Sequence, residues 1–262
     1  MANQPPAIFD SLAAAFADYG TTVRGYVRYQ LIQRNLTRYI PKKHGTVLDI
    51  GGGSGAETAW FATHGCQVTY IEPSTTQRRF AERRFNFLLD DDVRARITMG
   101  GDTTEDIKKT GELFDIVTMH AVAEYQKDPA RFIEGALQFV KPGGLVSIVE
   151  KGYYGAELRL LKASQFTELS KLRRTGYSTN NLKQKTYAFK PDEIQTLLEA
   201  HGFEVIEWSG IRVMTDDFVM PTDHMPARQL KIILDLEDAQ GHNPAIRGQG
   251  QLLHFIARKR QD

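Results

Sequence analysis

The sequence predicts an α/β protein with a doubly wound, mainly parallel sheet, and three observations support that fold class. A short apolar strand at 47–50 runs into a glycine-rich turn, and a helix starts near Ala56. Strand-like and helix-like segments then alternate as far as residue 149. The chain has 262 residues, 41% of them hydrophobic, which is enough for one large domain with insertions. We therefore expect the glycine turn to approach a nucleotide at the edge of the sheet.

Two helices are expected before the sheet. The first follows Pro5 and Pro6, and the segment Tyr19-Gly-Thr-Thr22 breaks it and provides Thr22 as the N-cap of the second. The second helix ends at Pro41, and its apolar side holds Tyr26, Tyr29, Ile32, Leu36 and Ile40. An arc of about 120° on the other side holds Arg24, Arg28, Arg34 and Arg38. We expect this helix to pack through one side and to present cations on the other.

The remaining elements follow from apolar periodicity and from turn residues. Up to residue 149 we expect strands and helices in the order strand 47–50, helix 56–64, strand 67–72, helix 74–89, strand 97–99, strand 114–119, helix 129–140 and strand 145–149. A basic, partly helical insertion, broken near 176–181, comes next. The predicted elements after it are helix 191–201, strands 203–208 and 211–214, an amphipathic helix around 230–236 and strand 252–257.

Composition argues against several classes of protein. No positively charged start is followed by an apolar core, and no apolar run approaches the roughly 18 residues of a spanning helix, so we expect a cytoplasmic protein without membrane contact. The single cysteine, Cys66, excludes an intrachain disulfide and a cysteine-based zinc site. The seven histidines lack the i, i+4 pairing of a metal-binding helix, so no metal is expected.

The net charge of +1 conceals two basic zones. Between Asp18 and Asp49 there is no acidic residue, and the cations there are Arg24, Arg28, Arg34, Arg38, Lys42 and Lys43. From Lys151 to Lys190, nine Lys and Arg stand against two Glu. Two such zones on a nearly neutral chain suggest a polyanionic partner, and the alternative is an ordinary solvated surface.

The glycine turn has two interpretations. The spacing Gly51-x-Gly53-x-x-Ala56 satisfies a dinucleotide-binding fingerprint. The longer pattern from Asp49, Asp-x-Gly-x-Gly-x-Gly, resembles motif I of class I S-adenosylmethionine-dependent methyltransferases. Glu72, at the end of the next strand, stands where a carboxylate accepts ribose hydroxyls, and Lys141-Pro-Gly-Gly144 looks like the turn before strand five of those enzymes. This resemblance implies a Rossmann-like fold with a seven-stranded mixed sheet, an antiparallel last strand, N-terminal helices and a helical insertion after strand five.

Further blocks are similar to one branch, the bacterial tRNA methyltransferases that esterify the carboxylate of wobble carboxymethoxyuridine. These blocks include Tyr19-Gly-Thr-Thr22, Arg28, His120-Ala-Val122, Gly210-Ile-Arg-Val213 and the closing Ala257-Arg-Lys259. The insertion at 152–187 matches poorly. The chain divides accordingly into a helical cap (1–44), a cofactor-binding core (45–150), a basic insertion on the acceptor side (151–190) and the rest of the core sheet (191–262).

Carried over residue by residue, the resemblance implies S-adenosylmethionine as cofactor and the anticodon arm of tRNA as partner. Arg28 would pair with the cofactor carboxylate, and Glu72 would take the ribose hydroxyls. The adenine edge would meet Asp102, Thr103 and Thr104. The remaining cofactor-binding candidates are Asp49, Gly51, Gly52, Gly53 and His120. The candidates beside the reacting methyl group and the acceptor are His120, Tyr19 and Arg212.

Each candidate also has a structural interpretation. Asp49 could only orient the glycine turn, His120 could be a strand-end histidine without a ligand, and Arg28 could pair with a surface carboxylate. Tyr19 stacks on a base or packs against the second helix, and Arg212 contacts the acceptor or makes a structural ion pair.

The reaction makes few demands that a sequence can reveal. Methyl transfer from a sulfonium is an in-line displacement, so the protein mainly aligns two partners. A carboxylate, with a reference pKa of about 4, is already ionised and needs no general base. Three other functions remain open: a small-molecule methyltransferase with a helical lid, a nicotinamide-dependent reductase, and a cofactor-binding RNA module without catalysis.

Overall fold

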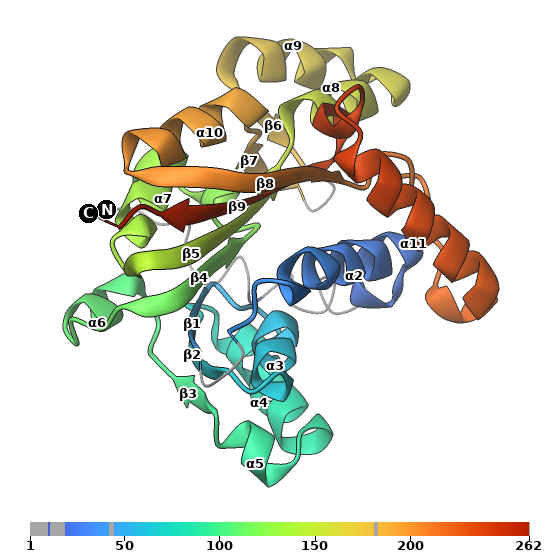
Figure 1. Ribbon diagram of the computed structural model, residues 1–262. Coiled ribbons are helices and arrows are strands. Elements are labelled where there is room, and N and C mark those ends of the chain that lie inside the picture. The colour runs from blue at the N-terminus through green and yellow to red at the C-terminus, as the bar shows by residue number, and fades with distance from the viewer. Residues whose placement is uncertain (1–9, 11–18, 42–44, 181–182, 262) are drawn as a thin grey trace.

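The computed structural model describes residues 10, 19–41, 45–180 and 183–261. Its centre is a seven-stranded sheet in the order β3-β2-β1-β4-β5-β9-β8 (Figure 1). The strands are β1 (Thr46–Ile50), β2 (Gln67–Ile71), β3 (Ile97–Met99), β4 (Phe114–His120), β5 (Val140–Lys151), β8 (Phe203–Ile211) and β9 (Leu252–Lys259). The last strand, β9, is antiparallel to both β5 and β8, whereas β1 to β5 pair in parallel. The predicted fold class is confirmed.

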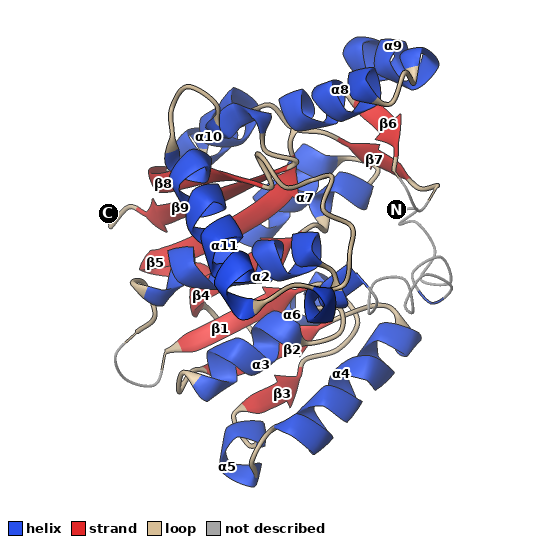
Figure 2. Ribbon diagram, turned by 90° about the vertical axis from the view of Figure 1, so that its right-hand side faces the viewer, coloured by secondary structure: helices blue, strands red, loops and turns tan. Residues whose placement is uncertain are grey.

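Helices cover both faces of this sheet. The helices of the core are α2 (Val23–Thr37), α3 (Ala56–Thr63), α4 (Thr75–Leu88), α5 (Asp91–Arg94), α6 (Thr104–Lys108), α7 (Pro129–Leu137), α10 (Pro191–Ala200) and α11 (Ala227–His242). The helices α2, α3 and α11 lie on one face of the sheet (Figure 2). Their apolar residues belong to one core cluster, and those of α7 and α10 belong to another on the opposite face. Short 3-10 turns lie at η1 (Ala123–Tyr125), η2 (Thr222–His224) and η3 (Arg247–Gln249). This two-sided cover explains why most residues of the central strands β1 and β4 are buried.

The orientation of α2 differs from the prediction. Thr22 caps the helix as expected, because its hydroxyl accepts from the backbone N–H of Gly25. The buried side, however, is Val23, Gly25, Val27, Leu31, Ile32, Asn35 and Leu36. The arginines do not form one solvated stripe either, because Arg34 pairs with Asp235 and Asp238 of α11, and Arg38 pairs with Glu207 of β8. The reason is that α11 and β8 lie beside this helix and supply the carboxylates.

Two predicted strand boundaries were wrong. Segments 203–208 and 211–214 are not separate strands: β8 runs unbroken to Ile211, and Arg212 then turns the chain with φ +57°. Residues 141–144 do not precede β5 but form an irregularity within it, since Phe114 pairs with Val140 and Ile116 already pairs with Leu145. A bulge absorbs the extra residues and leaves the rest of the pairing in register.

The insertion after β5 forms a small layer of its own. It consists of α8 (Tyr153–Lys162), α9 (Phe166–Thr175) and a hairpin of β6 (Tyr177–Thr179) and β7 (Lys185–Tyr187). Gly176 ends α9 in the left-handed conformation, at the break expected near 176–181. The layer lies beyond the last residue of β5, at the top of Figure 1. It therefore stands beside the carboxyl ends of the parallel strands, where ligands of such sheets bind.

Candidate functional site

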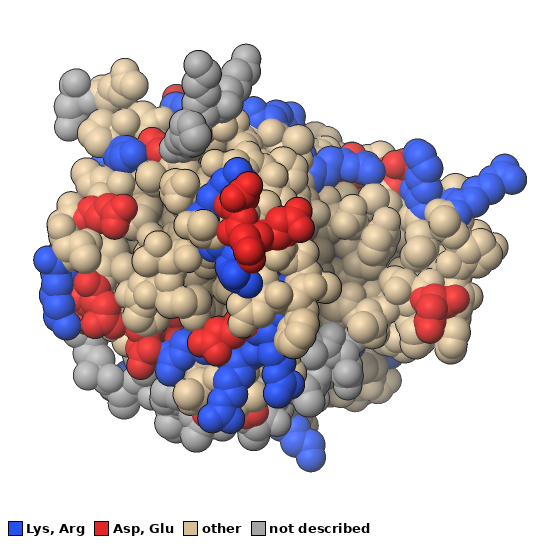
Figure 3. Space-filling model, turned by 90° about the horizontal axis from the view of Figure 1, so that it is seen from below, with Lys and Arg blue, Asp and Glu red and all other residues tan. Residues whose placement is uncertain are grey.

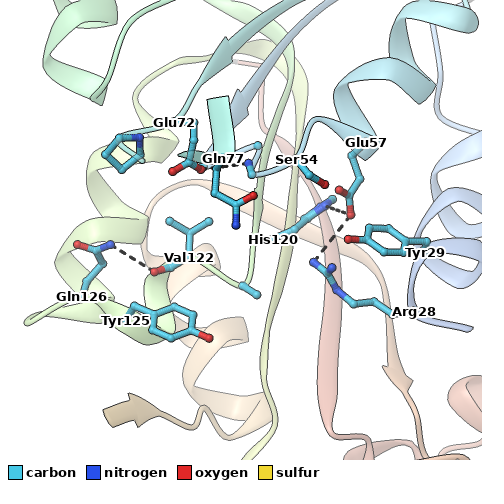
Figure 4. A pocket seen from close by; sticks show the side chains of 15 residues that line it. Arg28, Tyr29, Ser54, Glu57, Glu72, Gln77, His120, Val122, Tyr125 and Gln126 are labelled. Carbon is cyan, nitrogen blue, oxygen red and sulfur yellow. Dashed lines mark hydrogen bonds and ion pairs between the residues drawn. The ribbon is translucent and has the colours of Figure 1, made fainter. Parts of the chain in front are cut away.

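A pocket opens at the carboxyl ends of β1, β2 and β4, with an empty volume of about 830 Å³ (Figure 4). It is lined by Arg28, Tyr29, Gly51, Gly52, Gly53, Ser54, Glu57, Glu72, Pro73, Gln77, His120, Ala121, Val122, Tyr125 and Gln126. These residues come from α2, from the glycine turn with the start of α3, and from the segments that follow β2 and β4. This edge of a doubly wound sheet is where its ligands are held.

The glycine turn fits its surroundings only without side chains. Gly51 has φ +67°, and a Cβ atom there would lie 2.7 Å from Cγ2 of Val122. A Cβ atom on Gly52 would lie 2.6 Å from Cδ2 of Tyr70 and 2.8 Å from Oδ2 of Asp49. Backbone N–H groups and carbonyls, rather than side chains, therefore form this wall of the pocket.

Asp49 lies beneath the turn and does not line the pocket. It is 2% exposed, and its carboxylate accepts from the Thr58 hydroxyl at 2.5 Å and from the Thr118 hydroxyl at 2.8 Å. Burial raises the pKa of this carboxyl. Of its two interpretations, the contacts favour the orienting role.

Glu72 and Gln77 lie side by side at one end of the pocket (Figure 4). The Glu72 carboxylate accepts from the backbone N–H of Gly53 at 3.0 Å and from that of Ser74 at 2.8 Å. Burial nevertheless raises its pKa to about 6. Gln77 is 5% exposed, and its Oε1 is buried without a hydrogen-bond partner among the described residues. This end therefore holds acceptor oxygens suited to the hydroxyl and amino groups of a nucleoside.

Arg28, Glu57 and His120 converge at the other end (Figure 4). Glu57 Oε1 lies 3.8 Å from Arg28 Nη2 and 3.6 Å from His120 Nδ1. Burial alone would raise the pKa of Glu57, but His120 and Arg28 outweigh it and hold the pKa below its usual value. Glu57 was not predicted, and the signal available was its place in the first turn of the helix after the glycines.

A buried hydrogen-bond relay extends from His120 through the sheet to α2. His120 Nε2 lies 2.8 Å from the Ser147 hydroxyl, which lies 2.9 Å from His254 Nε2. The side-chain nitrogen of Asn35 lies 3.1 Å from His254 Nδ1 and donates to Ser209 at 3.0 Å. Burial lowers the pKa of His254 well below its usual value, so this ring is neutral.

One set of proton positions satisfies every contact of this relay. Asn35 donates to His254 Nδ1, so the proton of that neutral ring is on Nε2 and is donated to Ser147. Ser147 then donates to Nε2 of His120, and His120 carries its proton on Nδ1, facing the Glu57 carboxylate. Ser147 therefore occupies Nε2 of His120, and Nδ1, which carries the ring proton in this arrangement, is buried without a hydrogen-bond partner among the described residues.

The predicted acceptor residues Tyr19 and Arg212 meet each other beside the pocket rather than lining it. Arg212 Nη1 donates to the Tyr19 hydroxyl at 3.2 Å and lies 3.4 Å from Asp216 Oδ1. Tyr19 precedes α2, the helix that carries Arg28 into the pocket. The contacts agree with both a structural ion pair and a place on the acceptor side.

Asp102, Thr103 and Thr104, which were predicted to meet the adenine edge, are not among the described residues that line the pocket. Asp102 is 61% exposed and pairs with Arg78. Thr103 shares a capping box with Asp106 at the start of α6, and Thr104 begins that helix. The side chain of Thr103 is used in this cap and that of Asp102 in the ion pair with Arg78, and Pro73 and Gln77 are among the residues that line the pocket.

Two further classes of site are absent from the described ranges. No group of three or more His, Cys, Asp or Glu residues there could hold a metal ion. No helix in the same ranges is long and apolar enough to cross a membrane.

Comparison with known proteins agrees with this geometry. A family model described as a methyltransferase domain matches residues 19–208. The tRNA 5-carboxymethoxyuridine methyltransferase of Escherichia coli K12 is 25% identical over 97% of this chain and 96% of its own length. A ubiquinone biosynthesis O-methyltransferase of Coxiella burnetii is 26% identical over 71% of this chain and 73% of its own length. The crystal structure of an S-adenosylmethionine-dependent methyltransferase from Methanosarcina mazei superimposes with a TM-score of 0.57 and 18% identity, covering 87% of this chain and 98% of that one.

Proposed function

The chain belongs to the methyltransferase domain family, and from that premise we propose that it esterifies the carboxylate of wobble carboxymethoxyuridine in tRNA. It is an S-adenosylmethionine-dependent methyltransferase. The acceptor is the part that we infer. The proposal places the reaction in the cytoplasm, with tRNA.

The pocket fits the cofactor. The buried Glu72 carboxylate suits the ribose, and the Gln77 oxygen, which has no hydrogen-bond partner among the described residues, suits the adenine. The Arg28 guanidinium suits the methionine carboxylate. The backbone of Gly51, Gly52 and Gly53 leaves room for close approach. When bound, the cofactor supplies the methyl group of its positively charged sulfonium, and the rest of the cofactor leaves as a neutral thioether.

The observation that carries the proposal is the engagement of His120. Its Nε2 accepts from Ser147, and its Nδ1, 3.6 Å from Glu57 Oε1, carries the ring proton in that arrangement, so the neutral ring has no free lone pair to take a proton from an acceptor. Tyr125 cannot serve either, because burial raises its pKa well above the usual value and its hydroxyl contacts Asn180. These contacts favour an acceptor that is already ionised, such as a carboxylate.

A tRNA acceptor is supported by the relative from Escherichia coli, which is named for that substrate and matches almost the whole chain. The basic insertion, with exposed Arg174, Lys183 and Lys185, stands beside the pocket edge and offers phosphate contacts. The α2 zone contributes less, because Arg34 and Arg38 are paired with carboxylates. On the face in Figure 3, acidic and basic side chains are interspersed, so that face lacks the single-sign surface that a polyanion requires.

The test is methyl transfer from labelled S-adenosylmethionine to bulk tRNA from cells that make carboxymethoxyuridine but not its methyl ester. Nucleoside analysis should find the label as a methyl ester at the wobble uridine. No transfer to tRNA, with S-adenosylhomocysteine binding intact, would overturn the proposal and favour a small acidic metabolite. A small-molecule acceptor is the second candidate, because the chain is similar to a ubiquinone biosynthesis O-methyltransferase.

A further inference from the structure

The segment that follows β4 forms one wall of the cofactor pocket. The residues of this segment that line the pocket are Ala121, Val122, Tyr125 and Gln126 (Figure 4). Val122 packs closely against the glycine turn, because a Cβ atom on Gly51 would lie 2.7 Å from its Cγ2 atom. We call residues 121–126 the pocket wall. The position of its backbone therefore decides the shape of the pocket.

The conformation of the pocket wall is costly when its own residues are considered alone. The chain leaves β4 at Ala121 with φ +62°, which costs a non-glycine residue free energy. The 3-10 turn η1 follows, and the first N–H groups of a helical turn have no acceptor within that turn. The backbone N–H groups of Val122, Ala123 and Glu124 therefore need acceptors from elsewhere in the fold.

Glu150, near the end of β5, supplies all three acceptors. Its Oε1 accepts from the backbone N–H of Val122 at 3.3 Å and from that of Ala123 at 2.9 Å, and its Oε2 accepts from that of Glu124 at 2.9 Å. The Glu124 carboxylate in turn accepts from the backbone N–H of Lys151 at 3.0 Å. The pocket wall and the end of β5 are thus joined by hydrogen bonds in both directions.

Glu150 affects the pocket through the pocket wall and not by direct contact. It is fully buried, so water cannot readily replace its hydrogen bonds, and it is not among the described residues that line the pocket. Burial and the charge of Glu124 raise the pKa of Glu150 well above its usual value, against the opposing effect of the three N–H groups. Burying a carboxyl group is costly, and the hydrogen bonds that offset this cost all go to the pocket wall.

A second carboxylate, Glu237 of α11, makes the same arrangement elsewhere in the fold. It is also fully buried and accepts from the backbone N–H groups of residues 213, 214 and 215 at 2.9, 2.7 and 2.6 Å. The residue before this turn, Arg212, has φ +57°. Residues 213–215 are not among the described residues that line the cofactor pocket. Glu237 is therefore a control matched to Glu150 in burial, hydrogen bonding and backbone geometry.

We propose that Glu150 is a positioning residue for the cofactor, because it holds the pocket wall in the conformation to which S-adenosylmethionine binds. The inference goes beyond the proposed function and does not depend on the acceptor, since it concerns the cofactor side of the pocket. If Glu150 were only structural, its substitution would lower stability and leave cofactor affinity unchanged, as we expect for Glu237.

The first experiment compares Glu150→Gln with Glu237→Gln. Glutamine keeps the size of the side chain but replaces one oxygen by an NH₂ group, which cannot accept from a backbone N–H. Both variants should have a lower Tm than the wild type. Calorimetry should show that Glu150→Gln binds S-adenosylhomocysteine about tenfold more weakly, the factor expected if the pocket wall is competent about a tenth of the time. Glu237→Gln should keep the wild-type Kd.

The second experiment locates the effect by amide hydrogen exchange. In ligand-free Glu150→Gln, the N–H groups of residues 122–124 should exchange faster than in the wild type, and saturating S-adenosylhomocysteine should slow them again. In Glu237→Gln, the faster exchange should occur at residues 213–215, and residues 122–124 should exchange as in the wild type. Activity does not enter either measurement.

A double variant tests whether Glu150 acts by holding the strained backbone. Glycine adopts the φ of Ala121 without strain, so Ala121→Gly should make the pocket wall less dependent on Glu150. Introducing Glu150→Gln into Ala121→Gly should therefore weaken S-adenosylhomocysteine binding by a smaller factor than introducing it into the wild type. Equal factors in the two backgrounds would contradict this role.

The inference is wrong if Glu150→Gln lowers Tm but keeps the wild-type Kd for S-adenosylhomocysteine, or if Glu237→Gln weakens this binding to the same extent. If Glu150→Gln fails to fold, Glu150→Asp and Glu237→Asp give the same comparison, because each keeps the carboxyl group and shortens its reach by one methylene. Failure of the proposed function gives a different result. A wild type that methylates no tRNA would overturn the proposed acceptor, and the difference between the Glu150 and Glu237 variants would stand.

Discussion

The relay from Asn35 to His120 makes a prediction that can be worked out from the structure. Ser147→Ala removes one hydroxyl that donates to His120 Nε2 at 2.8 Å and accepts from His254 Nε2 at 2.9 Å. Ser147 is fully buried and His254 is 1% exposed, so water cannot readily replace the hydroxyl. The substitution therefore leaves two buried ring nitrogens without a partner.

Each unsatisfied buried group costs about 1–3 kcal/mol, so Ser147→Ala should reduce the free energy of unfolding by about 2–6 kcal/mol. For a chain of this size each kcal/mol lowers Tm by about 2–4 °C, which thermal unfolding followed by circular dichroism resolves. The matched control is Ser209→Ala at the far end of the relay. It removes a single acceptor from Asn35 and should cost about 1 kcal/mol.

Ring-nitrogen chemical shifts of ¹⁵N-labelled histidine distinguish this relay from packing alone. In the wild type, His120 should carry its proton on Nδ1 and His254 on Nε2. Ser147→Ala should release His120 into a mixture of tautomers and leave His254 unchanged, because Asn35 still donates to it. The reasoning is refuted if His120 in the wild type carries its proton on Nε2, or if Ser147→Ala costs less than Ser209→Ala.

Four further predictions concern the cofactor pocket and the acceptor. Arg28→Ala should weaken S-adenosylhomocysteine binding by about 1.5–3 kcal/mol through loss of a charged hydrogen bond, and unchanged affinity by calorimetry would remove Arg28 from the cofactor site. The pKa of Glu72 is raised by burial from 4.5 to about 6, so the folded protein binds this proton more tightly than the unfolded chain. The ligand-free protein should therefore gain about 2 kcal/mol of stability as the pH falls from above 6 to below 4.5. Glu72→Gln should lack this gain, which is measured by comparing the free energies of unfolding of variant and wild type at both ends of that pH range. Gly52→Ala should cost about 1–3 kcal/mol and lower cofactor affinity, because its Cβ would lie 2.6 Å from the buried Tyr70 ring, and a variant with wild-type Tm would contradict the tight fit. Affinity for tRNA should fall steeply with salt concentration as phosphate contacts release counterions, and a salt-independent Kd in filter binding would count against an RNA partner.

The fold was predictable because its signals are local. Apolar runs of about five residues, a turn that needs glycine at Gly51 and caps such as Thr22 each act over a few neighbours in the sequence. The errors occurred where long-range pairing overrides local pattern. Pairing with β4 draws Val140 into β5 ahead of its bulge, and pairing with β9 makes one strand of 203–211.

The site was predictable in part. The predicted residues that lie at the pocket are Arg28, Glu72, His120 and the glycine turn. Each of them stands at the end of a strand or within a motif with recognisable spacing. Asp102, Thr103 and Thr104 lie outside the pocket lining, and their position depends on the short strand β3 and on how α6 is capped. Gln77 could not be identified from the sequence, since a glutamine within a charged helix has no pattern that separates it from its solvated neighbours.

By itself, the sequence determined the doubly wound fold, the position of the cofactor turn and the excess of arginine in the N-terminal part. Tertiary structure decided what those arginines contact: α11 neutralises Arg34, whereas Arg28 lines the pocket beside the buried Glu57. It also decided the state of His120, through a relay whose members Asn35 and His254 are 219 positions apart. Charge balance and hydrogen-bond satisfaction depend on which groups are neighbours in space, and local spacing does not encode contacts across such distances in the chain.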